Sequence, residues 1–298
     1  MALYERHLQR PLDNPALVVA FEGWVDAGLG ADGAITALLS ASPTELVATF
    51  DGETLIDQRA RRPVVHIAHG INEGLTWPVI QMRVGTDRIG AEVCYLVGPE
   101  PDFRWPAFVS ATVSLVRELG VRMVVGLGAF PAPAPHTRPV RLAATAPGAS
   151  ADLVAQVGVV QGQIDVPSGV WGALEIALGE LEIPTVGLWA RVPHYVSGMA
   201  FPSASAALLD SLGQIAGLSL DSTDLHTAGD ASLRQIDDLI AKSDEHTAMV
   251  RQLEHTVDAA EGNPLDIGRI PTGEELAVEL ERYLRDERSD GGSANPED

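Results

Sequence analysis

The chain alternates between short apolar runs of strand length and longer stretches whose apolar residues recur at helical spacing. The predicted strands are residues 16–21, 44–50, 92–97, 121–127, 140–145 and 185–190, and residues 63–68 and 77–84 are expected to form a hairpin or a meander. The predicted helices are residues 26–39, 108–119, 169–181 and 203–215. Because strands and helices mostly follow one another in turn, we predict a three-layer α/β/α fold with a mainly parallel, mixed sheet.

The pattern changes beyond residue 221. Residues 230–260 form a long amphipathic stretch that includes Ile236 and Ile240. Thr272 and Glu275 have the spacing of a capping box and predict a further helix. We therefore predict three parts: an α/β/α core domain over residues 1–220, a C-terminal helical extension over 221–288 and a disordered tail over 289–298.

The chain is acidic, with a net charge of −21 from 41 acidic and 20 basic residues. This balance disfavours binding to a nucleic-acid backbone, which requires a basic face. Residues 221–298 hold 20 of the acidic residues and 7 of the basic ones. The C-terminal quarter is therefore either a solvated helical face with a loose tail or a surface that meets a basic partner.

Two rare residue types exclude whole classes of chemistry. Cys94 is the only cysteine, so disulfides within the chain and cysteine metal clusters are excluded. Lys242 is the only lysine, so residues 1–220 contain no P-loop lysine, Schiff-base lysine or kinase lysine. We expect no cofactor and no metal site.

The hydrophobic pattern also bears on location. No apolar run reaches the ~18–20 residues that a membrane span requires. The N-terminal residues do not have the basic and apolar segments of a secretory signal. We therefore expect no membrane association and a cytoplasmic protein.

Polar side chains gather where predicted strands end, which is the edge at which open α/β sheets bind ligands. Glu22, Trp24 and Asp26 follow the first strand. Glu22 and Asp26 are candidates for an acid–base pair, or Asp26 instead caps the following helix. Trp24 covers a ligand or anchors an interface, or else it packs against the next loop.

A second group lies between two prolines that fix the local backbone. His136, Thr137 and Arg138 are candidate anion ligands, because arginine offers a forked pair of donors. The alternative is that Arg138 pairs with an acidic side chain and that His136 caps a carbonyl group.

Two further positions complete the candidate pocket or interface. Ser168 is a candidate N-cap of the next helix, and a helix N-terminus favours anions. Arg191, His194 and Tyr195 follow the last predicted strand, at the expected edge of a pocket. None of these residues is assigned a catalytic role.

Four short motifs occur in an ordered set along the chain. They are Gly23-Trp24-x-Asp26-Ala27-Gly28, Gly126-x-Gly128-Ala129, Pro135-His136-Thr137-Arg138-Pro139 and Val192-Pro193-His194-Tyr195. With these motifs the chain resembles the proteasome assembly chaperone 2 family over residues 10–220, and its actinobacterial members in particular. The resemblance implies a core similar to nucleoside phosphorylases and a homo-oligomer, for which we expect a trimer. It also implies binding to proteasome subunits.

Two functions from different classes remain open. The first is a non-enzymatic, chaperone-like oligomer, favoured by the resemblance, by the missing lysine, cysteine and metal chemistry, and by the acidic extension. The alternative is an enzyme or small-molecule binding protein whose strand-end pocket holds an anion or a nucleoside-like ligand. In that case Arg138 and Arg191 would bind the anion. The observation that separates these two hypotheses is whether the candidate side chains converge on one cavity.

Overall fold

The main element of the fold is an eight-stranded sheet. The computed structural model describes residues 3–23, 25–159 and 162–261. The strands of the sheet are β1 (Tyr4–Arg6), β2 (Ala16–Glu22), β3 (Glu45–Phe50), β6 (Gln81–Thr86), β7 (Glu92–Pro99), β8 (Met123–Ala132), β9 (Leu142–Thr145) and β10 (Thr185–Pro193).

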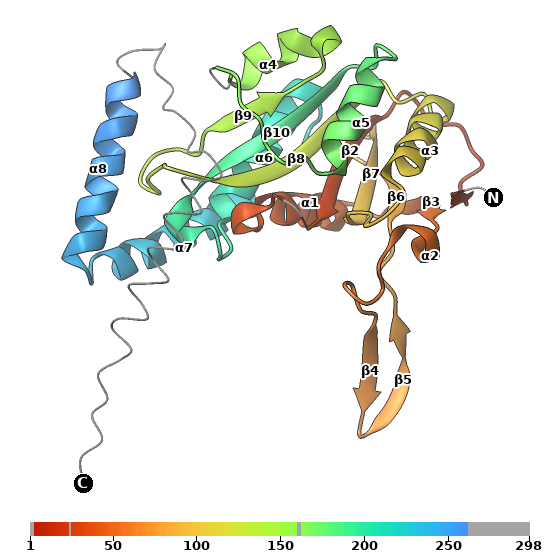
Figure 1. The fold of residues 1–298 in the computed structure, drawn as a ribbon, viewed down its shortest axis with the longest axis horizontal. Coiled ribbons are helices and arrows are strands. Elements are labelled where there is room, and N and C mark those ends of the chain that lie inside the picture. The colour runs from red at the N-terminus through yellow and green to blue at the C-terminus, as the bar shows by residue number, and fades with distance from the viewer. Residues whose placement is uncertain (1–2, 24, 160–161, 262–298) are drawn as a thin grey trace.

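The strands lie in the order β1-β3-β6-β7-β2-β8-β10-β9 (Figure 1). β2 pairs in parallel with β7 and β8, and β8 pairs in parallel with β10. The remaining pairs, β1–β3, β3–β6, β6–β7 and β9–β10, are antiparallel. Most strands, namely β2, β3, β7, β8 and β10, therefore run in one direction, and the predicted mainly parallel, mixed sheet is confirmed.

Helices cover both faces of the sheet, which confirms the predicted three layers. One face packs against α1 (Gly30–Ala41), α4 (Ala151–Val157) and α6 (Pro202–Ala216), and the other against α2 (Gly52–Leu55), α3 (Trp105–Glu118) and α5 (Val170–Gly179). Strand β2 shows why both faces are buried. Its alternate residues Ala16 and Val18 face the first set of helices, whereas Leu17 and Val19 face the second.

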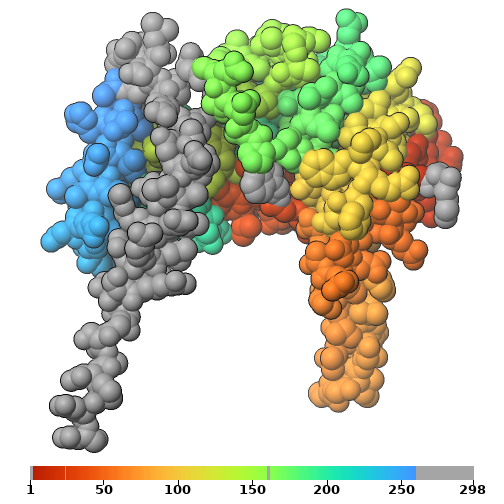
Figure 2. Space-filling view, viewed as in Figure 1, coloured from red at the N-terminus to blue at the C-terminus, as the bar shows by residue number. Residues whose placement is uncertain are grey.

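Strands β4 (Val64–Ala68) and β5 (Ile71–Thr76) form a separate hairpin that projects from the body (Figures 1 and 2). We call residues 64–76 the hairpin arm. The expected pairing of residues 63–68 with 77–84 is wrong, because the second segment joins the main sheet as β6. The arm instead turns at His69 and Gly70, whose φ angles of 51° and 82° suit a tight two-residue hairpin turn.

The C-terminal part, as far as residue 261, forms two helices, α7 (Thr223–Ile240) and α8 (Asp244–Glu261). The predicted continuous stretch over residues 230–260 is therefore interrupted. The Ser243 hydroxyl accepts a hydrogen bond from the His246 amide (3.3 Å), so it caps the start of α8. Lys242 is exposed in the turn that joins the two helices. The predicted capping box at Thr272 and Glu275 lies outside the described residues.

Helix α7 packs against α6 and buries Ile236, which is 1% exposed. None of the helices in the described ranges is long and apolar enough to cross a membrane. Strand β1 and helix α4 are missed by the sequence pattern. They span 3 and 7 residues, too few for a periodic pattern to stand out.

Candidate functional site

The loop after β2 is held in a strained conformation. Val25 and Leu29 have φ angles of 63° and 51°, which is uncommon for a non-glycine residue and most unusual for a β-branched one. The Val25 carbonyl accepts a hydrogen bond from the Ala129 amide (3.1 Å), and the Gly28 amide donates to the Ser197 carbonyl (2.8 Å). Strand β8 and the segment that follows β10 therefore fix the shape of this loop.

Asp26 caps helix α1 across a short 3-10 turn (Ala27–Leu29). Its carboxylate accepts hydrogen bonds from the amides of Ala31 (2.6 Å) and Asp32 (2.9 Å). Burial raises the pKa of Asp26 in spite of these bonds. The capping role is confirmed, and Asp26 is engaged with the helix rather than with Glu22, which is exposed at the end of β2. Trp24 lies outside the described residues.

His136 is 3% exposed and links the proline-rich loop to two other elements. The Tyr195 hydroxyl oxygen accepts a hydrogen bond from the His136 backbone amide (2.8 Å) and also bonds to His136 Nδ1 (2.7 Å). His136 Nε2 donates to the carboxylate of Asp237 in α7 (3.0 Å), which can only accept. Burial raises the pKa of Tyr195 to about 12, so the phenol keeps its proton at neutral pH.

Thr137 and Arg138 hold α8. The Thr137 hydroxyl donates to Glu254. Arg138 donates through Nε and one terminal nitrogen to Asp258 (2.8 and 2.7 Å), and through its other terminal nitrogen to Glu254 (3.2 Å). These carboxylates raise the pKa of Arg138. His136, Thr137 and Arg138 therefore do bind anions, but these anions are carboxylates of this chain. For Arg138 this is the alternative that the sequence left open, pairing with an acidic side chain. We call these contacts the helix clamp.

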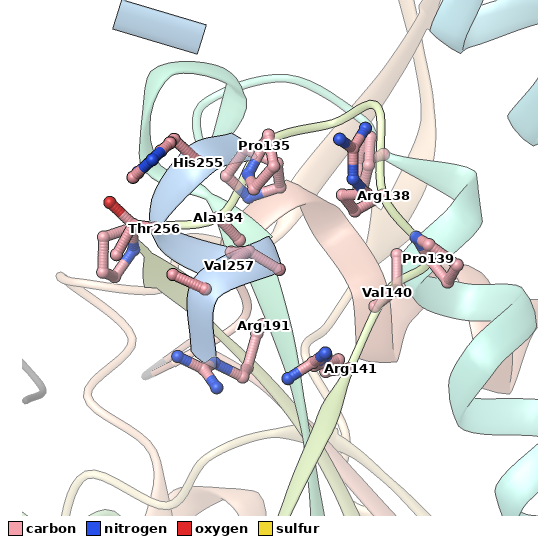
Figure 3. A pocket seen from close by; sticks show the side chains of 14 residues that line it. Ala134, Pro135, Arg138, Pro139, Val140, Arg141, Arg191, His255, Thr256 and Val257 are labelled. Atoms are coloured by element: carbon pink, nitrogen blue, oxygen red, sulfur yellow. The ribbon is translucent and has the colours of Figure 1, made fainter. Parts of the chain in front are cut away.

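A pocket of about 490 Å³ lies between this loop, the end of β10 and α8 (Figure 3). Arg138, Arg141 and Arg191 reach it from the body, and His255 reaches it from α8. None of the described residues that line the pocket is acidic. Three arginines and one histidine therefore line this pocket in a chain with a net charge of −21, and one of them, Arg138, is already bonded to Asp258 and Glu254.

Arg141 and Arg191 are neighbours on adjacent segments of the sheet. The Arg191 backbone amide donates to the Arg141 carbonyl (3.0 Å), and Figure 3 shows both side chains at the same end of the pocket, away from Arg138. Partial burial and the nearby charge of Arg141 lower the pKa of Arg191. Within the described ranges, the Arg191 guanidinium has neither an ion pair nor a hydrogen bond.

The remaining candidates among the described residues do not converge on this pocket. His194 stacks edge-to-face on Tyr195, with ring centroids 5.3 Å apart, and Tyr195 faces His136. The prediction that Ser168 is an N-cap is wrong, because Gly169 occupies that position and the Ser168 hydroxyl donates to the Gly169 carbonyl (2.8 Å). Of the nine candidates, Arg138 and Arg191 line the pocket.

Sequence reasoning missed Arg141 and His255. Arg141 lies three residues after Arg138, and this closeness to the candidate anion ligands was the one feature of the sequence that could have indicated it. His255 lies more than a hundred residues further along the chain, on a helix whose docking the sequence pattern does not specify.

Glu175 of α5 is a second residue that the sequence did not single out. It is 9% exposed, and its Oε1 has no hydrogen-bond partner among the described residues. Burial raises its pKa to about 7, although Thr145 and the Gly187 amide form hydrogen bonds to the carboxyl group. A helical glutamate ordinarily faces solvent, so only the packing of α5 against β9 and β10 reveals this one.

Metal and thiol chemistry find no support in the described part of the chain. No group of three or more His, Cys, Asp or Glu side chains there is placed to hold a metal ion. Cys94 is fully buried in β7, and burial raises the pKa of its thiol to about 12. A thiol with that pKa stays protonated and is a poor nucleophile.

Comparison with known proteins adds a family match. A sequence model of the PAC2 family matches residues 20–240. No curated protein matches the chain. A solved protein of unknown function from Corynebacterium glutamicum is 32% identical, with a TM-score of 0.83 over 87% of this chain and 98% of that chain.

Two further solved structures are informative. A proteasome-assembly chaperone homologue from Mycobacterium tuberculosis is 33% identical, with a TM-score of 0.73, over 79% of this chain and 99% of that chain. The archaeal proteasome activator PbaB from Pyrococcus furiosus is 15% identical, with a TM-score of 0.59, over 80% and 99% of the two chains. The PbaB structure shares the fold of this chain.

Proposed function

The chain belongs to the PAC2 family, as its ordered motifs predict, and on this premise we propose that it is a cytoplasmic, chaperone-like protein that binds proteasome subunits during assembly. The observation that carries the proposal is the 33% identity to a proteasome-assembly chaperone homologue, which is matched over 99% of its length. No catalytic step is part of this function.

The roles of the strand-end side chains support an interaction protein. Asp26 caps a helix, His136 bonds to Tyr195 and Asp237, and Arg138 holds α8. These groups maintain the shape of one edge of the molecule. An enzyme would require some of them to be available to a substrate.

The hairpin arm supports self-association, with a second copy of this chain as the partner that it contacts. Val64, Val65, Ile67, Ile71 and Leu75 of the arm are each 42–68% exposed. A two-stranded hairpin is only marginally stable in water, and exposed apolar patches mark interaction sites.

Charge favours the same partner. Arg59 and Arg62 are exposed at the base of the arm, and a second copy of the chain carries a net charge of −21. Copies related by rotation would each insert an arm against the next body and form a closed homo-oligomer, for which we propose a trimer.

Binding to purified proteasome subunits tests the function. The full-length chain is immobilised, and the separate α- and β-subunits of the source organism are passed over it. An unrelated protein of similar negative charge serves as the control for nonspecific attraction. We expect selective retention of one subunit type and a change in the rate at which complete particles form on native gels. Retention no greater than on the control, together with an unchanged assembly rate, would contradict the proposal.

A further inference from the structure

Two buried polar atoms of helix α5 have no hydrogen-bond partner among the described residues. They are Trp171 Nε1 and Glu175 Oε1, and the two residues are 8% and 9% exposed. The residues are four positions apart, so they share one face of the helix, which packs against β10. An unpaired buried polar group costs free energy, and such groups in native proteins nearly always bond to protein or to ordered water. Both atoms therefore require a partner.

Trp171 cannot turn its N–H group towards another acceptor. A Cβ atom on Gly126 would lie 2.5–2.6 Å from ring atoms of Trp171, so the indole lies directly against the backbone of β8. A Cβ atom on Gly187 would lie 2.7 Å from Trp171 Nε1. The ring therefore occupies the space that these two glycines leave, and its donor atom is fixed beside Gly187 of β10.

Glu175 reaches the same place. Its carboxyl group bonds to the Gly187 amide and to the side chain of Thr145 in β9, which lies opposite Gly187 in the ladder between the two strands. Thr145 Oγ1 also accepts a hydrogen bond from Trp189 Nε1 (3.0 Å). These bonds leave Glu175 Oε1 without a partner. One unpaired donor and one unpaired acceptor are therefore gathered around a single glycine.

The hydroxyl of Thr112 in α3 is also buried and unpaired, but it differs from these two atoms. A hydroxyl group can rotate, and a threonine inside a helix commonly donates to the carbonyl group four residues before it. Thr112 can therefore find a partner within its own helix, whereas the indole nitrogen of Trp171 is held by the ring.

The unpaired donor and acceptor select the kind of molecule that can lie beside them. Trp171 Nε1 can only donate, so it would face a cation with a positive hydrogen atom, and an ionised Glu175 would repel an anion. A water molecule accepts from the indole and donates to the carboxyl oxygen, so it satisfies both atoms. Both residues are more than nine-tenths buried, which favours one small molecule over a larger ligand.

We propose that one water molecule is bound beside Gly187, where it accepts a hydrogen bond from Trp171 Nε1 and donates one to Glu175 Oε1. The water completes a polar network that continues from Glu175 through Thr145 to Trp189 and ties α5 to both β9 and β10. The site is separate from the pocket beneath α8 and does not depend on the assembly role proposed above.

A crystal structure of the full-length protein, at a resolution that shows ordered water, tests the proposal directly. We expect one water molecule within about 2.7–3.2 Å of both Trp171 Nε1 and Glu175 Oε1. A direct bond between the two atoms, an empty site, or density for an ion or a larger molecule would each overturn the proposal.

Nuclear magnetic resonance tests the same site in solution, with isotope-labelled indole nitrogens. The Trp171 signal is assigned by its loss in Trp171→Phe. We expect magnetisation transfer between the Trp171 indole proton and bound water in the parent and in Glu175→Gln, whose amide oxygen still accepts a bond. The transfer should disappear in Glu175→Met, which has no such acceptor.

Trp105 is the internal control, because its Nε1 already donates to the Pro101 carbonyl (2.6 Å). Its signal should be the same in Glu175→Met as in the parent, which shows that the variant is folded. The parent measurement decides the matter even if Glu175→Met does not fold. No transfer to Trp171 in the parent, or equal transfer in a folded Glu175→Met, would contradict the water site.

Discussion

At the scale of single residues, Glu175 shows how burial sets a proton affinity. Its pKa is about 7 in the folded chain against 4.5 for an ordinary glutamate, and desolvation is the main cause. The folded state therefore holds a proton that the unfolded state releases between about pH 4.5 and 7. The contribution of Glu175 to stability is most favourable below pH 4.5 and is lost as the pH rises through 7.

Replacing this carboxyl group should remove that pH dependence. Glu175→Gln is expected to raise the free energy of unfolding by about 1–3 kcal/mol at pH 8 and to change it little at pH 5, since each pKa unit corresponds to about 1.4 kcal/mol. Urea unfolding at the two pH values measures the difference. Glu180→Gln, at an exposed position after the same helix, is the control. Equal destabilisation by Glu175→Gln at both pH values would contradict the prediction.

At the scale of elements, the helix clamp explains how α8 is held. One three-residue segment binds α7 through His136 and α8 through Thr137 and Arg138. The sequence identified this segment as anion-binding because of its flanking prolines and residue types. It did not identify the anions, because Glu254 and Asp258 lie 116 and 120 residues from Arg138.

Loss of the clamp should loosen α8 selectively. In Arg138→Gln, amide hydrogen exchange over residues 244–261 is expected to become faster, while exchange in α6 stays slow because the core is intact. Mass spectrometry of exchanged peptides measures this. Arg88→Gln breaks an exposed ion pair with Asp221 and should leave α8 unchanged. Unchanged protection of α8 in Arg138→Gln would show that other contacts hold it.

The elements themselves were predicted well where burial imposes a pattern. β2 is buried on both faces and reads as a continuous apolar run, Ala16 to Ala20, followed by a glycine-containing turn. β5 was missed because it belongs to an exposed hairpin. Without burial against a core, its sequence does not need to alternate apolar with polar residues, and Asn72, Glu73 and Gly74 interrupt its apolar residues. The pocket could not be predicted from the sequence either, because one of its walls is α8, which comes from a distant part of the chain.

At the scale of the whole molecule, the hairpin arm projects from the body and is separate from the main sheet (Figures 1 and 2). Its apolar side chains are exposed in the single chain, and their burial against a second copy would stabilise an assembly by about 25 cal/mol per Å² of nonpolar surface. The proposed oligomer should therefore depend on the arm more than on the rest of the surface.

Charge on the arm should dissociate the assembly. Sedimentation velocity of Ile67→Asp/Ile71→Asp is expected to show a monomer, whereas the parent chain is expected to sediment as the proposed trimer. The control is Ile89→Asp, which changes an isolated isoleucine that is 78% exposed in a turn of the body. An unchanged sedimentation coefficient in the double variant, or a monomeric parent chain, would refute the role of the arm.

The turn between α7 and α8 has a practical consequence. It carries Lys242, the only lysine of the chain, and that lysine is exposed. An amine-reactive dye will therefore label this turn and the α-amino group. The buried thiol of Cys94 is protected from maleimides, so a cysteine introduced elsewhere accepts a second dye. Energy transfer between the two dyes can then follow the position of the C-terminal helices in the native protein.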